Sequence, residues 1–211
     1  MELKPDPTRA ALAERAAAGE VRRQSRLFSE RMLLRILPEV VPCALVVLNA
    51  QRQIVFANDR FMDLAYPGKR RDQVYGLRPG EALGCIHANE SLDGCGTTEF
   101  CSTCGAVGAI LASQQGQAEV RECRILRGET SEALDLRVWA SPVEVEGESF
   151  SVFAALDISH EKRRQALERI FLHDIHNVAC GLSWCIGFLD KAGPQERGRH
   201  LDDIRRLCRE L

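Results

Sequence analysis

The chain has 211 residues, a formal net charge of -2, 45% hydrophobic residues and 27% charged residues. This balance excludes an intrinsically disordered chain and a basic nucleic-acid binder, so no nucleic-acid partner is expected. The longest uncharged apolar run, Val40 to Ala50, contains a proline and is far shorter than the roughly 20 residues of a membrane-spanning helix. The N-terminus also lacks the apolar segment of a signal peptide. We therefore expect a cytoplasmic protein with no membrane span.

The first 37 residues predict an N-terminal helical segment that precedes the globular domain. Residues 8–37 are rich in Ala, Leu, Arg and Glu and contain no proline. Apolar residues in this stretch follow a wide stripe at helical spacing. They are Leu27, Phe28, Met32, Leu33 and Ile36. The pattern predicts one or two amphipathic helices.

The middle of the chain predicts an antiparallel sheet with helices on one face. Apolar runs at Ala44–Leu48 and Ile54–Ala57, separated by turn residues, indicate a hairpin, and Asn58 can cap the short helix that follows. Three more strand candidates come later in the chain. They are Ala118–Leu126, Ala133–Glu144, in which apolar and polar residues alternate, and Ser149–Asp157. This order of elements indicates an α+β fold.

That order, over about residues 38–159, resembles the PAS sensor domain. Two short strings add to the likeness: IVFANDRF, from Ile54 to Phe61, and LDIS at Leu156–Ser159, which looks like the exit where PAS domains continue into a signalling helix. The resemblance implies a five-stranded antiparallel sheet and a ligand or cofactor pocket between the sheet and the helices.

Four cysteines cluster in the helical half, within residues 84–105. Cys85, Cys95, Cys101 and Cys104 have the spacing C-x9-C-x5-C-x2-C. In a cytoplasmic protein such a cluster more often binds metal than forms disulfides, and both zinc and iron-sulfur clusters accept four thiolates. Only one C-x2-C pair is present, and the last three cysteines approximate the C-x4-C-x2-C run of plant-type ferredoxins. Neighbouring glycines could let backbone N–H groups approach the sulfurs. The sequence therefore predicts an iron-sulfur cluster, 4Fe-4S or 2Fe-2S, with zinc as the alternative.

Other interpretations of the cluster stay open. His87 could replace a cysteine, although we prefer to interpret it as a loop residue that does not touch the metal. Cys123 could offer a fifth sulfur if its strand faces the pocket. A disulfide switch between Cys101 and Cys104 is a further alternative, since a C-x-x-C pair at a helix N-terminus has a lowered thiol pKa.

The last third, residues 160–211, predicts a helical hairpin. From Leu167 to Leu189 apolar residues follow steps of three and four, which indicates one helix of roughly 40 Å at about 1.5 Å per residue. Gly193 and Pro194 interrupt it, and a second amphipathic helix follows, which we expect to be truncated by the end of the sequence. Two such hairpins would bury their apolar faces in a four-helix bundle, so we predict a homodimer.

The first arm of the hairpin carries His173-Asp174-Ile175-His176-Asn177, which resembles the phosphoacceptor box of sensor histidine kinases, H-[Asp/Glu]-x-x-[Asn/Thr]. The resemblance implies that His173 is the phosphoacceptor, Asp174 its base and Asn177 the residue that orients water for the reverse reaction. Val178 stands where many members carry proline. The alternative is that both histidines are ordinary polar residues on a helix.

No Gly-rich phosphate loop follows the box, so we expect ATP to act only through a catalytic domain absent from this chain. The predicted partners are that ATP-binding kinase domain and a response-regulator receiver domain. The predicted function is the signal-sensing and phosphoacceptor portion of a two-component sensor histidine kinase, with the metal centre sensing redox state or a diatomic gas. The rival is a zinc-stabilised PAS binding module in which His173 is incidental.

Overall fold

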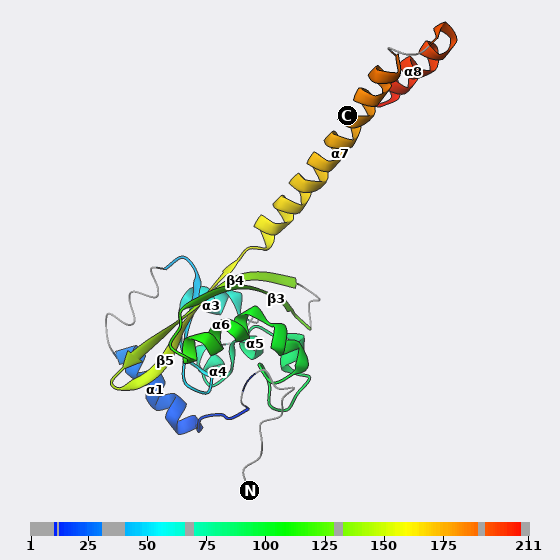
Figure 1. The fold of residues 1–211 in the computed structure, drawn as a ribbon. Coiled ribbons are helices and arrows are strands. Elements are labelled where there is room, and N and C mark those ends of the chain that lie inside the picture. The colour runs from blue at the N-terminus through cyan, green and yellow to red at the C-terminus, as the bar shows by residue number, and fades with distance from the viewer. Residues whose placement is uncertain are drawn as a thin grey trace. The chain divides into compact units, whose positions relative to one another are not determined.

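The computed structural model describes residues 11, 13–30, 41–65, 70–128, 133–189 and 193–207. The chain divides into two compact units, Met1–Ser159 and His160–Leu211. The first unit contains a sheet and most of the helices, and the second contains two helices (Figure 1).

The first unit is built on a five-stranded antiparallel sheet with the strand order β2-β1-β5-β4-β3. The strands are β1 (Ala44–Leu48), β2 (Ile54–Ala57), β3 (Glu119–Leu126), β4 (Ala133–Val145) and β5 (Glu148–Asp157). All five predicted strands are present, and each end differs from its prediction by one residue at most. The α+β class is therefore confirmed.

Strand β4 shows why the sequence pattern was informative. Its residues Leu134, Leu136, Val138 and Ala140 are buried and alternate with half-buried residues. Because successive side chains of a strand point to opposite faces, this alternation places one face of the sheet against the main hydrophobic core.

Short helices and one longer helix cover that face (Figure 1). They are α3 (Asp59–Leu64), α4 (Arg71–Val74), α5 (Pro79–Ala82), η1 (Ile86–Ala88), η2 (Glu99–Thr103) and α6 (Gly105–Gln114). The predicted cap of α3 is confirmed, because the Asn58 side-chain oxygen accepts a hydrogen bond from the Phe61 N–H at 2.9 Å. The same oxygen accepts the Leu45 N–H at 2.9 Å, so the cap also ties α3 to β1.

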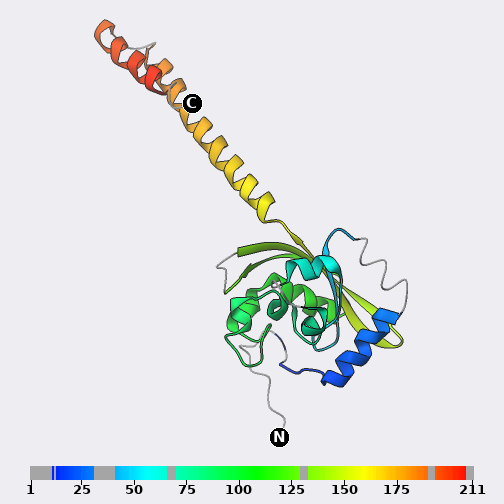
Figure 2. The same cartoon turned by 180° about the vertical axis from the view of Figure 1, so that it is seen from behind.

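Helix α1 (Ala18–Glu30) packs on the opposite face of the sheet, beside the β4–β5 hairpin (Figure 2). The Phe28 and Phe150 rings meet edge to face with their centres 5.0 Å apart. Arg23 and Gln24 of α1 both bind the Glu148 carboxylate. These contacts fix α1 to the first residues of β5.

The predicted N-terminal helix was wrong at its start. We expected helix from residue 8, but residues 13–17 are not helical and α1 begins at Ala18. The physical reason is that tertiary hydrogen bonds replace helical ones in this segment. The Ala13 and Glu14 carbonyls accept from Arg78, and the Ala16 N–H donates to the Gln53 side chain. The predicted apolar positions Met32, Leu33 and Ile36 lie outside the described residues.

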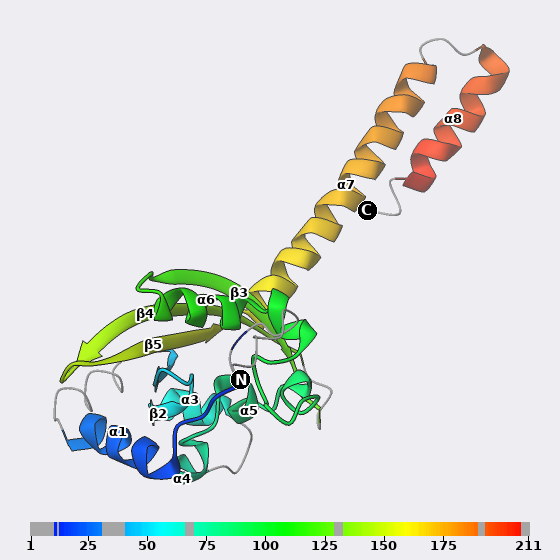
Figure 3. The ribbon, with the colours of Figure 1, turned by 60° about the horizontal axis from the view of Figure 1, so that its bottom comes forward.

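The second unit consists of α7 (Ser159–Leu189) and α8 (Pro194–Leu207), with α8 turning back along the last part of α7 (Figure 3). The 31 residues of α7 span about 46 Å at 1.5 Å per residue, close to the predicted length. Among the described residues, no helix is long and apolar enough to cross a membrane. The dimeric four-helix bundle stays a prediction.

Candidate functional site

A cavity of about 330 Å³ lies between the inner face of the sheet and the helical layer. Its wall includes all four predicted cysteines together with Cys123 and His87. They are positioned by different elements: Cys85 precedes η1, Cys101 lies in η2, Cys104 is the N-cap of α6, and Cys123 lies in β3. The structure therefore places five thiols around one cavity, four from residues 85–104 and one from β3.

The cysteine sulfurs accept hydrogen bonds from the backbone. The Gly96 N–H donates to the Cys101 sulfur at 3.3 Å, and the Thr98 hydroxyl lies 3.2 Å from the same sulfur. The other three predicted cysteines also have backbone N–H partners: His87 and Ala88 for Cys85, Gly80 for Cys95, and Ala106 and Val107 for Cys104. The expected approach of glycine N–H groups to sulfur is thus confirmed at Gly96. Such donors stabilise thiolates, and around metal clusters they tune the reduction potential.

At Gly80 the backbone of α5 lies close to the side chains of Cys95 and Cys85. A Cβ atom on Gly80 would lie 2.6 Å from the Cys95 sulfur and 3.5 Å from the Cys85 Cβ. Any side chain at this position of α5 would therefore displace Cys95. The glycine keeps room for the sulfur against the helix.

The thiols of the cavity differ strongly in pKa. Burial raises the pKa of Cys95 to about 12, and burial also raises the pKa of Cys85. A hydrogen bond from Cys123 lowers the pKa of Cys104 to about 6, and the same bond, followed by burial, raises the pKa of Cys123. In the metal-free protein Cys104 is therefore the favoured thiolate at neutral pH, while Cys95 and Cys123 stay protonated.

Two buried arginines flank the cysteines, and no sequence pattern pointed to them. Arg52 is 4% exposed and Arg78 is 0% exposed. Burial, and then repulsion by Arg78, lowers the pKa of Arg52 to about 10, whereas negative charge on Cys95 and Cys101 acts in the opposite direction. The two guanidinium groups thus place positive charge beside the thiols, where thiolates would be stabilised.

Arg78 also holds three segments together through backbone carbonyls. It donates to Gln51 in the β1–β2 turn at 3.2 Å, and to Ala13 and Glu14 at 3.0 and 2.9 Å. It also donates to Asp93 and Cys95 at 2.9 and 3.1 Å, in the segment of residues 84–105 that we name the cysteine loop. This bonding explains how a fully buried cation is accommodated.

The segment of residues 13–17, which we name the N-terminal strap, is also tied to the cysteine loop through Glu81. One carboxylate oxygen of Glu81 lies 2.5 Å from the Arg15 guanidinium and accepts the Cys95 N–H at 3.1 Å. Just before the strap, Ala11 shares a small apolar cluster with Cys101 and Val107. The start of the described chain therefore covers the cysteine loop.

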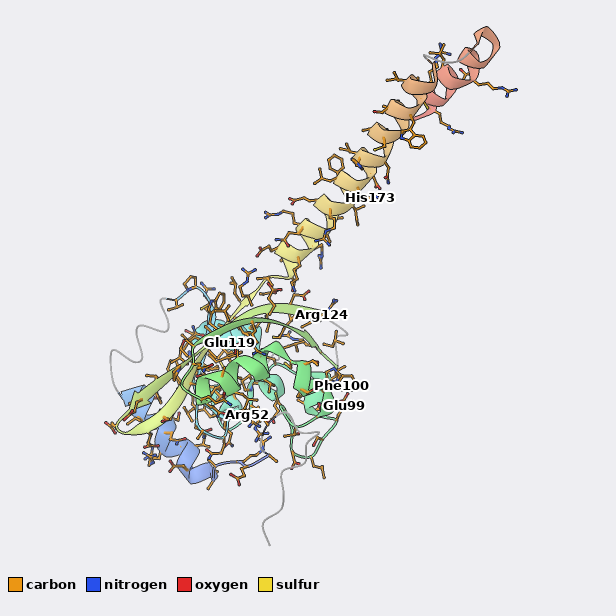
Figure 4. All side chains as sticks on the ribbon, viewed as in Figure 1. Arg52, Glu99, Phe100, Glu119, Arg124 and His173 are labelled. Atoms are coloured by element: carbon orange, nitrogen blue, oxygen red, sulfur yellow. The ribbon has the colours of Figure 1, made fainter. Side chains whose placement is uncertain are left out.

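His87 lies on the cavity wall. Its Nδ1 is 2.8 Å from the Glu90 carboxylate, and its ring stacks on Phe100 with the ring centres 4.3 Å apart. Phe100 is 61% exposed and lies beside Glu99 at the edge of the helical layer (Figure 4). Exposed Arg124 of β3 also lines the cavity, which therefore reaches the surface on this side. The role of His87 as a metal ligand stays a prediction.

The predicted iron-sulfur site is not present as a ready-made ligand cage. Among the described residues, no group of three or more His, Cys, Asp or Glu side chains is arranged so that it could hold a metal ion. The physical reason is that the cysteines line the wall of a cavity, with their sulfurs bonded to backbone N–H groups or to another thiol. The chemistry of the donors fits a thiolate-bound group: several sulfurs, N–H donors and adjacent positive charge.

The predicted phosphoacceptor box lies on α7, in the second unit. The His173 side chain is 70% exposed, and its Nδ1 lies 3.2 Å from both an Asp174 carboxylate oxygen and the Asn177 amide nitrogen. The apolar positions Phe171, Ile175 and Val178 repeat at steps of four and three. At about 100° per residue, His173 and Asn177 fall on the side of the helix opposite to these apolar positions. Figure 4 shows His173 on α7. The His173 imidazole is therefore accessible to a second protein.

No family model matches the sequence, and no curated protein matches it. Among solved structures, the chain is similar to the PAS domain of an HTR-like protein from Haloarcula marismortui, with 22% identity over 65% of this chain and 98% of that one and a TM-score of 0.41. A PAS domain from a two-component sensor histidine kinase has 13% identity over 61% and 96%, with a TM-score of 0.41. A LOV protein from Rhodobacter sphaeroides has 14% identity over 92% and 93%, with a TM-score of 0.42.

The first unit has a PAS-like fold, and we call it the PAS-like domain. It has a five-stranded antiparallel sheet and an N-terminal helix, and the long helix of the second unit follows its last strand. In this PAS-like domain the cavity lies between the sheet and the helices, the place that the sequence resemblance implied for a ligand or cofactor. The phosphoacceptor hairpin stays a prediction.

Proposed function

We propose that this chain is the sensory and phosphoacceptor portion of a two-component sensor histidine kinase, and that the cysteines of the C-x9-C-x5-C-x2-C run bind an iron-sulfur cluster. The observation that carries the proposal is the gathering of five thiols around one cavity of a PAS-like domain. Backbone N–H groups directed at four of these sulfurs support it, because they favour the thiolate forms that metal ligands require.

The charge around the cavity supports the same proposal. Four thiolates around a doubly positive centre leave a net charge of about -2. Arg52 and Arg78 supply two positive charges beside the cysteines, so the buried charges of arginines and thiolates would compensate one another. Buried charge is otherwise costly, because it is removed from water.

A bound cluster would supply a centre that responds to redox state or to a diatomic gas. The resulting structural change at the cavity would then be transmitted through β4 to α7. Leu136 of β4 lines the cavity, and its neighbour Asp135 accepts the Ile158 N–H at 2.8 Å and donates its own N–H to the Ser159 hydroxyl at 2.9 Å. Residues 157–159 lead directly into α7, so we infer that a shift of β4 is passed to this helix.

The second unit would form the output as a homodimer. Large apolar side chains of α7 lie exposed in the single chain, with Phe171 at 64%. The others include Leu167, Ile170, Leu172, Ile175 and Ile186. The spacing of Phe171, Ile175, Val178, Leu182 and Cys185 is that of a coiled-coil seam. We infer that two copies bury these seams in a four-helix bundle and leave His173 exposed to an ATP-binding kinase domain and a receiver domain.

The metal proposal is tested by purifying the chain without oxygen and measuring iron, zinc and acid-labile sulfide together with the visible spectrum. Iron with matching sulfide and absorbance at roughly 400 nm supports the cluster. One zinc per chain without colour supports the zinc-stabilised alternative and contradicts redox sensing by a cluster. Cys101→Ala should lower the metal content, whereas Cys43→Ser, outside the cavity, should not.

The phosphoacceptor proposal is tested separately. The chain is incubated with labelled ATP and the ATP-binding domain of a sensor kinase. Label should appear on the wild type and on His176→Gln and be absent from His173→Gln. Label that persists on His173→Gln would contradict the assignment, and Asn177→Ala should retain label but lose it more slowly, because water is no longer oriented.

A further inference from the structure

Cys123 is the fifth sulfur of the cavity and lies outside the predicted run of four. It lines the same cavity as Cys104, the residue that caps α6, and the interaction of the two thiols lowers the pKa of Cys104 and raises the pKa of Cys123. Cys101, in contrast, has the Gly96 N–H and the Thr98 hydroxyl as its partners. Cys104 and Cys123 thus form a candidate pair on two different elements, the start of α6 and strand β3.

Backbone packing holds this pair in place. Gly105, the first residue of α6, lies directly against β3, so that a Cβ atom on it would overlap the carbonyl oxygen of Glu122 and lie 3.2 Å from the Arg121 Cβ. Glu122 immediately precedes Cys123, and Gly105 immediately follows Cys104. The backbones that carry the two cysteines are therefore in contact, and both side chains line the same cavity.

We propose that Cys104 and Cys123 form a redox-active pair that closes to a disulfide when a hydroperoxide enters the cavity of the metal-free protein. The cavity reaches the surface beside Phe100, and Cys104 is the less buried of the two cysteines. The inference does not depend on the identity of the metal. It concerns a state in which the cysteines hold none.

The reaction has two steps. The Cys104 sulfur attacks the terminal oxygen of the hydroperoxide and the O–O bond breaks, so that Cys104 becomes a sulfenic acid. The thiol proton passes to the leaving oxygen, which departs as an alcohol, or as water in the case of hydrogen peroxide. The Cys123 sulfur then attacks the Cys104 sulfur, the S–O bond breaks, and water leaves with the thiol proton. Two thiols lose two electrons in total, and the hydroperoxide gains them. The disulfide removes Cys104 from the set of possible metal ligands.

The experiment maps the disulfide in the full chain. The protein is stripped of metal with a chelator, reduced, desalted without oxygen, and treated with hydrogen peroxide before free thiols are blocked. Trypsin cleaves after Arg121 and Arg124 and so separates Cys123 from the peptide that contains Cys85, Cys95, Cys101 and Cys104. The expected product is a cross-link between these two peptides, assigned to Cys104 by fragmentation.

Two variants and one control test which cysteines form the cross-link. In Cys123→Ser the cross-link should be lost and a sulfenic acid on Cys104 should be trapped by dimedone. In Cys104→Ser the cross-link should also be lost, whereas the matched control Cys43→Ser should form it as the wild type does. A disulfide between Cys101 and Cys104, a cross-link that survives in Cys104→Ser, or fully reduced thiols after peroxide would each overturn the proposal.

Discussion

The Arg78 guanidinium donates a hydrogen bond to the backbone carbonyl of Cys95 at 3.1 Å. A fully buried guanidinium group is thus hydrogen-bonded to the backbone of a cysteine on the cavity wall. The same side chain also donates to the carbonyls of Ala13 and Glu14 in the N-terminal strap. The strap and the cysteine loop are therefore connected through one residue.

Replacing Arg78 should destabilise the PAS-like domain. Arg78→Met keeps much of the side-chain volume but leaves buried carbonyl groups without donors, and we expect a loss of roughly 3–5 kcal/mol in the free energy of unfolding. Urea denaturation, monitored by circular dichroism, measures this loss of free energy. Arg70→Met, at an exposed arginine paired with Asp72, is the control and should unfold like the wild type. Equal midpoints for Arg78→Met and the wild type would show that Arg78 does not hold these segments.

Gly80→Ala should impair metal binding without changing any cysteine. The added methyl group would lie 2.6 Å from the Cys95 sulfur, so this sulfur must move away from its place on the cavity wall. We expect the metal content per chain to fall roughly ten-fold or more. Gly19→Ala in α1, where a Cβ would meet nothing within 4 Å, is the matched control. It should keep the metal and gain about 0.5–1 kcal/mol in stability. Normal metal content in Gly80→Ala would contradict the placement of Cys95.

The reactivities of Cys104 and Cys95 should rise with pH over different ranges. Iodoacetamide reacts with thiolates, and the pKa of Cys104 is lowered to about 6, so its alkylation should rise through pH 6 and be nearly constant above pH 7. The pKa of Cys95 is raised to about 12 by burial, so this thiol should react slowly until the solution is strongly alkaline. The measurement uses metal-free Cys101→Ser protein and cleavage after Phe100, which separates the two sites for mass spectrometry. A Cys104 rate that still climbs steeply between pH 7 and pH 9 would contradict the lowered pKa.

Phe171→Asp should dissociate the proposed homodimer. A carboxylate in the apolar seam of α7 would be buried without a partner, which strongly disfavours association. Light scattering should give twice 23.5 kDa for the wild type and 23.5 kDa for the variant. Arg169→Asp, outside the seam, should remain dimeric. A wild-type chain that is monomeric at all concentrations would refute the bundle.

Local patterns in the sequence were sufficient for the sheet and for the short helix after it. Alternation in residues 133–144 predicted β4, and Asn58 predicted the start of α3, because strand periodicity and helix capping act between residues close together in the chain. Cysteine spacing likewise identified four residues of the cavity wall. The start of α1 was not predicted, because it depends on Arg78, which lies far away in the sequence.

By itself, then, the sequence determined the strands, the helix after β5, the four clustered cysteines and the exposed position of His173 on its helix. The tertiary structure alone decided that Cys123 and Cys104 line one cavity where α6 meets β3, that Arg52 and Arg78 are buried beside the thiols, and that the N-terminal strap covers the cysteine loop. The physical reason is that these contacts join distant segments. They arise where α6 packs against β3 at Gly105 and where the carbonyls of three segments converge on one guanidinium, and neither arrangement leaves a periodic pattern in the chain.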